Sequence, residues 1–291
     1  MDEVVRYYED RAVFVRSGSG RRRLLAADGV VAAAFDHRTS RAGDPLLHTH
    51  VVTANMTCRR SADGELVWRA IPGAGLYEHA RAAGHLYQAH LRHLLSERLG
   101  LASTPVVNGT AEVVGVPERV IELFSKRRQE IAEVLSESGA SSARAAQVAT
   151  LETRQAKQYG VDADSLDAGW RREAAGVGFG SEQVAACFDR TAVAQVARTE
   201  VDVAGLFDRL AGPSGLTERS ATFRRTEVIE AIASAVGASA SARTVEALAD
   251  RFLGSSGRCW WTAHPLRPQP MRPSATPKPH RRTVRSWRRR R

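Results

Sequence analysis

The sequence predicts an α+β protein in which an antiparallel sheet comes before a set of helices. Segments rich in β-branched residues, separated by turn residues, fill roughly the first 70 of its positions. Amphipathic segments with helical periodicity begin near residue 76 and continue through most of the chain. Strands that precede helices, rather than alternating with them, are typical of a fold whose helices cover one antiparallel sheet.

The expected strands contain β-branched or aromatic residues and end at turns. Asp44-Pro45 lies in a turn-rich segment, where the residue before proline is disfavoured from helical geometry. A second tight turn is expected at "ADGEL", before Trp68. The strands are expected at "RAVFVRS" (11–17), "GVVAAAFDH" (29–37) and "LHTHVVTANMTC" (47–58). Together they predict a sheet built from hairpins.

The expected helices each carry an apolar face. The longest is "LYEHARAAGHLYQAHLRHLLSERLG", which ends at Gly100 and is expected to pack on the sheet. Further amphipathic helices are predicted at 117–135, with Pro117 in the first turn, and at 143–158. Beyond Gly160 the chain is expected to be mostly helical.

Charge and cysteine content restrict the classes of protein. The chain has a net charge of +10, but eleven of its 42 basic residues and none of its 32 acidic residues lie in 258–291. The other 257 residues therefore carry 31 basic and 32 acidic groups, a net charge of −1. Its three cysteines are far apart, which excludes a disulfide framework and a CxxC metal site. No signal peptide or membrane span is expected, so the predicted location is the cytoplasm.

Residues 258–291 are expected to form a disordered basic tail. Six of the eleven prolines lie there, and apolar periodicity is lost. One interpretation is a basic arm that binds phosphate backbones without sequence preference. The other is an accidental carboxyl end, such as out-of-frame translation of GC-rich DNA.

Three histidines are the strongest candidates for chemistry. Side chains two residues apart in a strand point to the same face, so His48 and His50 lie one pleat apart. If the preceding strand pairs antiparallel with His37 opposite His48, all three imidazoles share that face. The ten residues between His37 and His48 do not determine this register. Three imidazoles with open positions form a divalent-metal site suited to Lewis-acid chemistry.

Alternative interpretations of the His-x-His pair differ in what should follow it. Structural histidines are common, so the pair alone is weak support for a metal. A cupin-like site needs a glutamate four or five residues after the second histidine, where this chain has Ala54 and Asn55. A metallo-β-lactamase-like site needs an Asp-His pair directly downstream, and "VVTAN" has none. Neither of these families fits.

A longer stretch, "AAAFDHRTSRAGDPLLHTHVVTANMT", resembles the metal-binding segment of conjugative relaxases of the TrwC type. The resemblance continues through "WRAIPGAGLYEHARAAGHLYQAHLRHLLSERLG" and "TLETRQAKQYGVDADSLDAGWRREAAGVG", and covers roughly residues 1–257. It implies an enzyme whose tyrosine attacks a phosphodiester of single-stranded DNA at a plasmid transfer origin. The products are a covalent phosphotyrosine and a free 3′ hydroxyl.

The resemblance also implies roles for particular residues. It makes His37, His48 and His50 the ligands of a divalent ion, Mg²⁺ or Mn²⁺, with Zn²⁺ as an alternative. Asp44 then either orients a ligand from behind or caps the turn, and capping is favoured. Two loop arginines, Arg38 and Arg41, are candidates to contact DNA phosphates. The alternative is that both remain solvated. Single-stranded DNA is the implied partner, and other conjugation proteins are possible partners.

The sequence departs from the family at the nucleophile. Relaxases of this type carry the tyrosine well upstream of the first metal histidine, and only 36 residues precede His37 here. Tyr7 and Tyr8 match a structural helix, so neither is expected to be the nucleophile. We therefore expect a truncated relaxase that lacks the catalytic amino-terminal part. No G-x-x-x-x-G-K-[ST] occurs, so no ATP-driven motor activity is expected either.

The resemblance divides the chain into four expected parts. They are the carboxyl-terminal part of a relaxase domain (1–160), a helical linker (161–212), the start of a helicase-like region (213–257) and the basic tail (258–291). The resemblance makes Thr217 to Ala235 the first helical element of the helicase-like region. Two functions remain open at this point. The chain is either part of a metal-dependent enzyme that nicks and joins single-stranded DNA, or a non-catalytic remnant that binds metal and DNA. Whether it is itself an enzyme is left open.

Overall fold

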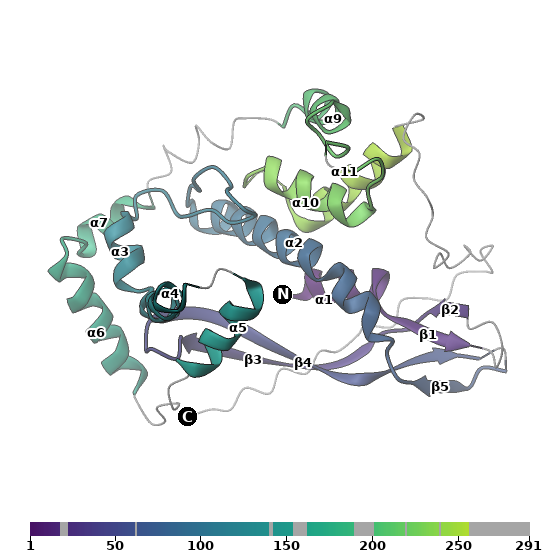
Figure 1. Ribbon diagram of the computed structural model, residues 1–291, viewed down its shortest axis with the longest axis horizontal. Helices are drawn as coiled ribbons and strands as arrows, with labels where there is room; N and C mark the ends of the chain where they lie inside the picture. The colour runs from purple at the N-terminus through teal and green to yellow at the C-terminus, as the bar shows by residue number, and fades with distance from the viewer. Residues whose placement is uncertain are drawn as a thin grey trace.

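The computed structural model has the predicted α+β class, with antiparallel strands and a larger number of helices (Figure 1). It describes residues 1–17, 23–61, 63–139, 142–153, 162–188, 201–218, 220–238 and 240–255. The expected basic tail, 258–291, lies outside the described residues. Among the described residues, no helix is both long enough and apolar enough to cross a membrane.

The strands form two antiparallel sheets. Strands β1 (Phe14–Ser17) and β2 (Arg23–Ala26) pair with each other. Strands β3 (Val30–Thr39), β4 (Pro45–Arg60) and β5 (Leu66–Arg69) form a second sheet in the order β3-β4-β5. The 16-residue β4 is therefore central, and β3 is an edge strand among the described strands.

Helices account for most of the remaining described chain. Their bounds are α1 (Asp2–Arg11), α2 (Gly73–Leu99), α3 (Glu118–Leu123), α4 (Lys126–Ser138), α5 (Ala143–Glu152), α6 (Ala163–Gly176), α7 (Ser181–Ala186), α9 (Val203–Ala211), α10 (Arg225–Ala235) and α11 (Ala242–Ser255). Helix α2 ends where the sequence predicts, because Gly100 adopts the left-handed cap with φ 67°.

Two expected helices differ in extent from the prediction. The segment 117–135 divides into α3 and α4 at Ser125, whose hydroxyl donates a 2.6 Å hydrogen bond to the Ile121 carbonyl. Such a bond competes with continuation of the helix. The element expected from Thr217 begins only at Arg225, where Glu227 accepts a hydrogen bond from the Arg224 backbone N–H.

The main hydrophobic core lies between helices. Helix α2 contributes its small apolar face, Ala82, Ala83, Leu86 and Ala89, and packs against α1, α10 and α11. Figure 1 shows α9, α10 and α11 on the far side of α2 from the sheet. The core runs from Tyr7 to Phe252, so it contains residues from both sides of the domain boundary expected at residue 160.

Charged contacts reinforce this helical body. Arg6 of α1 pairs with Glu246 of α11, and Arg243 of α11 donates to Glu3 of α1 at 2.9 Å. Arg92 of α2 is only 3% exposed and reaches α10. Its guanidinium donates to the carbonyls of Ala233 (2.9 Å) and Gly237 (3.2 Å), which lie at the carboxyl end of α10. A cation is favoured there by the helix dipole.

The sheet itself receives little cover from these helices. In β3, residues 31 to 36 are all exposed, and Phe35 keeps 52% of its surface accessible. The expectation that α2 packs on the sheet is therefore wrong for most of β3. The physical reason is that the buried face of α2 is already occupied by α1, α10 and α11.

Loss of the Arg92 guanidinium should loosen α10 from α2. We expect Arg92→Met to lower the free energy of unfolding by about 2–3 kcal/mol, because the buried carbonyl of Ala233 and the half-buried carbonyl of Gly237 lose a charged donor. Urea denaturation followed by circular dichroism measures this change. Arg98→Met, at an exposed position of the same helix, is the matched control and should leave stability nearly unchanged. Equal stability of both variants would contradict this role for Arg92.

Candidate metal centre

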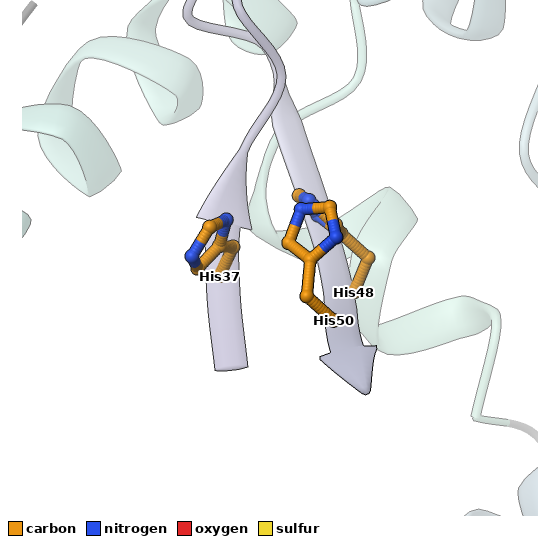
Figure 2. Close-up of side chains that lie close together, drawn as sticks. All are labelled: His37, His48 and His50. Atoms are coloured by element: carbon orange, nitrogen blue, oxygen red, sulfur yellow. The ribbon is translucent and has the colours of Figure 1, made fainter. Parts of the chain in front are cut away.

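The three histidines predicted as ligands lie together on one face of the β3–β4 pair. The backbone register places His37 directly opposite His48 and Phe35 opposite His50. Because alternate residues of a strand share a face, this register brings all three imidazoles to the same side. The register that the sequence left open is thus the one that assembles the cluster, and Figure 2 shows the rings gathered above the two strands.

The rings are close enough to share one ion. Their centroids lie 4.7 to 5.2 Å apart, and one ring nitrogen from each histidine lies within 4.8 Å of the others. Imidazole nitrogens bind ions such as Zn²⁺ at about 2.0–2.1 Å, so nitrogens on one ion are at most about 4.2 Å apart. Small rotations of half-buried or exposed side chains can bridge this difference. The residues present therefore fit a metal ion.

His48 is held in one tautomer by its own strand. Its Nδ1 lies 2.9 Å from the Leu46 carbonyl oxygen. A carbonyl oxygen can only accept, so Nδ1 carries the proton and donates it. The lone pair is then on Nε2, which is the arrangement that a metal-binding histidine needs. The opposite face of the sheet also holds the register, because the Thr49 hydroxyl donates to Asp36 at 2.7 Å.

The turn between the ligand strands is closed by Ser40 and Asp44. The Ser40 backbone N–H donates to the Asp44 carbonyl (2.9 Å), and the Asp44 N–H donates to the Ser40 hydroxyl (3.1 Å). That hydroxyl donates in turn to the Asp44 carboxylate at 3.2 Å. Gly43 has φ 81°, a left-handed conformation that glycine adopts without strain. The side chain that accepts the backbone N–H groups of the turn is therefore that of Ser40, which accepts from Ala42 and Asp44, and the role of Asp44 stays a prediction.

The two arginines predicted to contact DNA are both exposed, but only Arg41 lies in a loop as expected, because β3 extends through Arg38 to Thr39. Arg38 lies on β3 directly after His37, and Arg41 lies in the turn. Both residues therefore belong to the segment that joins His37 to His48. Contact with phosphates by either side chain remains a prediction.

The two amino-terminal tyrosines lie in helix α1, within or against the helical core. Tyr7 is fully buried, and its hydroxyl lies 2.7 Å from Nδ1 of His79 on α2. Burial raises the pKa of Tyr7. It also raises the pKa of Tyr8, which is less buried. A raised pKa disfavours the phenolate, which is the reactive form of a tyrosine nucleophile. The environment of Tyr7 is thus typical of a tyrosine that packs in a core.

Three residues near the turn were not predicted from the sequence. Lys126 of α4 lies 3.7 Å from the Asp44 carboxylate, and it also donates to Glu173 of α6 at 2.9 Å. The indole N–H of Trp170, also on α6, donates to the Gly43 carbonyl at 2.9 Å. These residues lie more than 80 positions beyond the turn, so no local pattern connects them to it.

Comparison with known proteins identifies relatives of this chain. The sequence model of the TrwC relaxase family matches residues 1–177, which include all three histidines, the turn and α1 to α6. A curated relative, the multifunctional conjugation protein TraI of Escherichia coli, is 35% identical over 185 residues. That match covers 62% of this chain and 10% of the relative, so the chain spans about a tenth of the length of this protein.

Solved structures of conjugative relaxase TrwC share the fold. A metal-free complex of TrwC with oriT DNA is 32% identical with a TM-score of 0.54, covering 60% of this chain and 61% of that chain. A metal-bound complex of TrwC with oriT DNA is 30% identical with a TM-score of 0.53, covering 62% of this chain and 65% of that chain.

The burial of His79 makes stability depend on pH. Burial lowers the pKa of His79 from its usual 6.5, so the unfolded chain binds this proton at a higher pH than the folded chain. Stability is then complete above about pH 6.5 and decreases as the pH falls below it. We expect the free energy of unfolding, from urea denaturation, to fall between about pH 7 and pH 5.

The variant His79→Gln isolates this contribution. Its pH dependence should be shallower than that of the wild type, although not flat, because burial also lowers the pKa of His85 and of His90. An unchanged pH dependence in His79→Gln would contradict the assignment.

Proposed function

The chain belongs to the TrwC relaxase family, and we propose that it serves metal-dependent nicking and joining of single-stranded DNA at a plasmid transfer origin. The observation that carries this proposal is the cluster of three histidines, with one ring nitrogen from each within 4.8 Å of the others, inside the region that the family covers. The similarity to TrwC structures solved with oriT DNA supports the same partner for this chain.

The proposed reaction is a transesterification. A tyrosine hydroxyl attacks the phosphorus of a phosphodiester, its proton leaves, and the departing 3′ oxygen takes up a proton as the phosphotyrosine bond forms. His37, His48 and His50 would hold a divalent ion, which polarises a phosphoryl oxygen and neutralises developing charge when it is bound. The number of ester bonds is unchanged, so the reverse reaction rejoins the strand.

Surrounding residues are given supporting roles in this proposal. Arg38 and Arg41 would contact phosphates on either side of the scissile bond, since both are exposed beside the histidines. Mg²⁺ or Mn²⁺ is the proposed ion because phosphate oxygens suit these ions, while imidazole ligands make Zn²⁺ the alternative. Other conjugation proteins are proposed partners of the complete assembly.

A second candidate function is favoured by the environment of Tyr7. A fully buried tyrosine with a raised pKa is poorly suited to attack a phosphate on the sheet surface. In this candidate the chain binds metal and single-stranded DNA without supplying the nucleophile itself. The two candidates share the metal centre and differ in whether a covalent adduct forms.

Metal binding tests what the two candidates share. We expect Mn²⁺ or Zn²⁺ to bind to the wild type in isothermal titration calorimetry, and the binding to be lost in His48→Ala, which removes one of three ligands. The matched control is His93→Ala, a partly buried histidine on α2 outside the cluster. Failure of the wild type to bind any divalent ion would overturn both candidates.

Adduct formation then separates the two candidates. The substrate is a single-stranded oligonucleotide with a hairpin and a cleavage site, of the kind described for TrwC. If the chain supplies the nucleophile, a denaturation-resistant protein–DNA adduct should form with metal and be absent in the corresponding tyrosine variant, Tyr7→Phe or Tyr8→Phe. Metal-dependent binding in fluorescence anisotropy without an adduct would select the binding candidate.

A further inference from the structure

The turn between the ligand strands is tied to helices that are distant in sequence. Asp44 is only 2% exposed, although its neighbours Gly43 and Pro45 are exposed. One of its carboxylate oxygens accepts from Ser40 within the turn. The other, Oδ1, has no hydrogen bond among the described residues, and the Lys126 ammonium lies 3.7 Å from it.

A buried carboxylate of this kind requires an opposite charge. Burial of an ion without a nearby opposite charge is strongly unfavourable, so a carboxylate as buried as that of Asp44 favours a cation beside it, although the Lys126 side chain itself is 41% exposed. Lys126 places a positive charge beside Asp44. Its hydrogen bond to Glu173 raises the pKa of Lys126, and Asp44 adds to this effect, so the ammonium stays protonated.

The contacts join the turn to two helices at once. Lys126 begins α4, while Glu173 lies on α6. Trp170, also on α6, holds the turn through the carbonyl of Gly43, directly before Asp44. Because β3 is otherwise largely exposed, these contacts hold the end of the β3–β4 pair that carries the histidines.

The contacts of the turn with Lys126 and Trp170 lie close to two of the ligands. The turn begins after Thr39 and ends at Pro45, and Thr39 pairs with Pro45 across the strands. The pairing is irregular between His37 and Thr39, so the regular ladder does not continue without interruption from the ligands to the turn. His37 lies two residues before Thr39 and His48 three residues after Pro45, so the contacts that hold the turn act on the strand ends that carry these two ligands.

We propose that Asp44 and Lys126 are positioning residues for the metal centre, which fix the turn between His37 and His48 onto α4 and α6. The proposal rests on metal binding by the three histidines, as proposed above. It follows that metal binding and docking of the turn are coupled: an ion that joins the two strands stabilises the docked turn, and the docked turn increases the affinity for the ion.

Two variants remove the charge interaction between Asp44 and Lys126 while the turn itself is kept. Asp44→Asn keeps an acceptor for Ser40 and loses the charge opposite Lys126, while Lys126→Met loses the ammonium. We expect the dissociation constant for Co²⁺ to rise about tenfold in each, the lower end of the range for residues that support metal ligands. The visible absorption of bound Co²⁺ should also change, because it reports how the imidazoles are arranged around the ion.

The double variant and a control complete the experiment. Asp44→Asn with Lys126→Met should bind Co²⁺ no more weakly than either single variant, since both remove one interaction. Arg171→Met removes an exposed pair with Asp167 within α6 and should leave affinity and spectrum unchanged. Circular dichroism of each variant identifies any loss of folding. Where a variant does not fold, hydrogen exchange of the wild type replaces it, and slower exchange in α4 on Co²⁺ binding supports the coupling.

The outcomes are distinct for the two proposals. If the wild type binds Co²⁺ and the folded variants bind it equally well with the same spectrum, the positioning role is overturned and the metal centre stands. In the hydrogen-exchange experiment, unchanged exchange in α4 has the same meaning. If the wild type does not bind Co²⁺ or any other divalent ion, the proposed function fails, and the positioning role fails with it.

Discussion

The pairing of His37 with His48 is the constraint on which the candidate site depends. A shift of one residue along β4 would turn the histidines of the two strands to opposite faces, and no ion could then contact all three. The chain holds this register from several directions. Thr49 and Asp36 pair on the opposite face, and the Ser40–Asp44 turn limits where the strands can meet. The chemistry proposed for the site is therefore a consequence of strand register.

The site and the main core occupy different parts of the molecule. The core is a packing of α1, α2, α10 and α11, reinforced by Arg92 and by the ion pairs of α1 with α11. The histidines lie on strands that this core scarcely touches. Substitutions in the core should thus act on stability, whereas those near the turn act on the site, and the two kinds of effect can be measured separately.

Much of this arrangement could be predicted from the sequence, for identifiable reasons. Alternation along a strand placed His48 and His50 on one face, and the glycine at position 100 marked the end of α2. The register opposite His37 could not be derived, because a ten-residue connection permits several pairings. The break at Ser125 depends on one side-chain hydrogen bond. The contacts of Lys126 and Trp170 with the turn are tertiary, and no sequence period encodes them.

Among the described strands, β3 lies at the edge of its sheet, which affects how this part of the protein behaves in solution. Charged residues and prolines usually protect an edge strand from pairing with other chains. Residues 30 to 35 of this strand, "VVAAAF", contain neither. The Val30 N–H at the start of the strand already donates to the Glu9 carboxylate at 3.1 Å, but no described strand pairs with the outer edge of β3, so this edge is a template for intermolecular strand addition. Concentration should consequently control the colloidal state of the protein, and dilute samples are the suitable starting point for its handling.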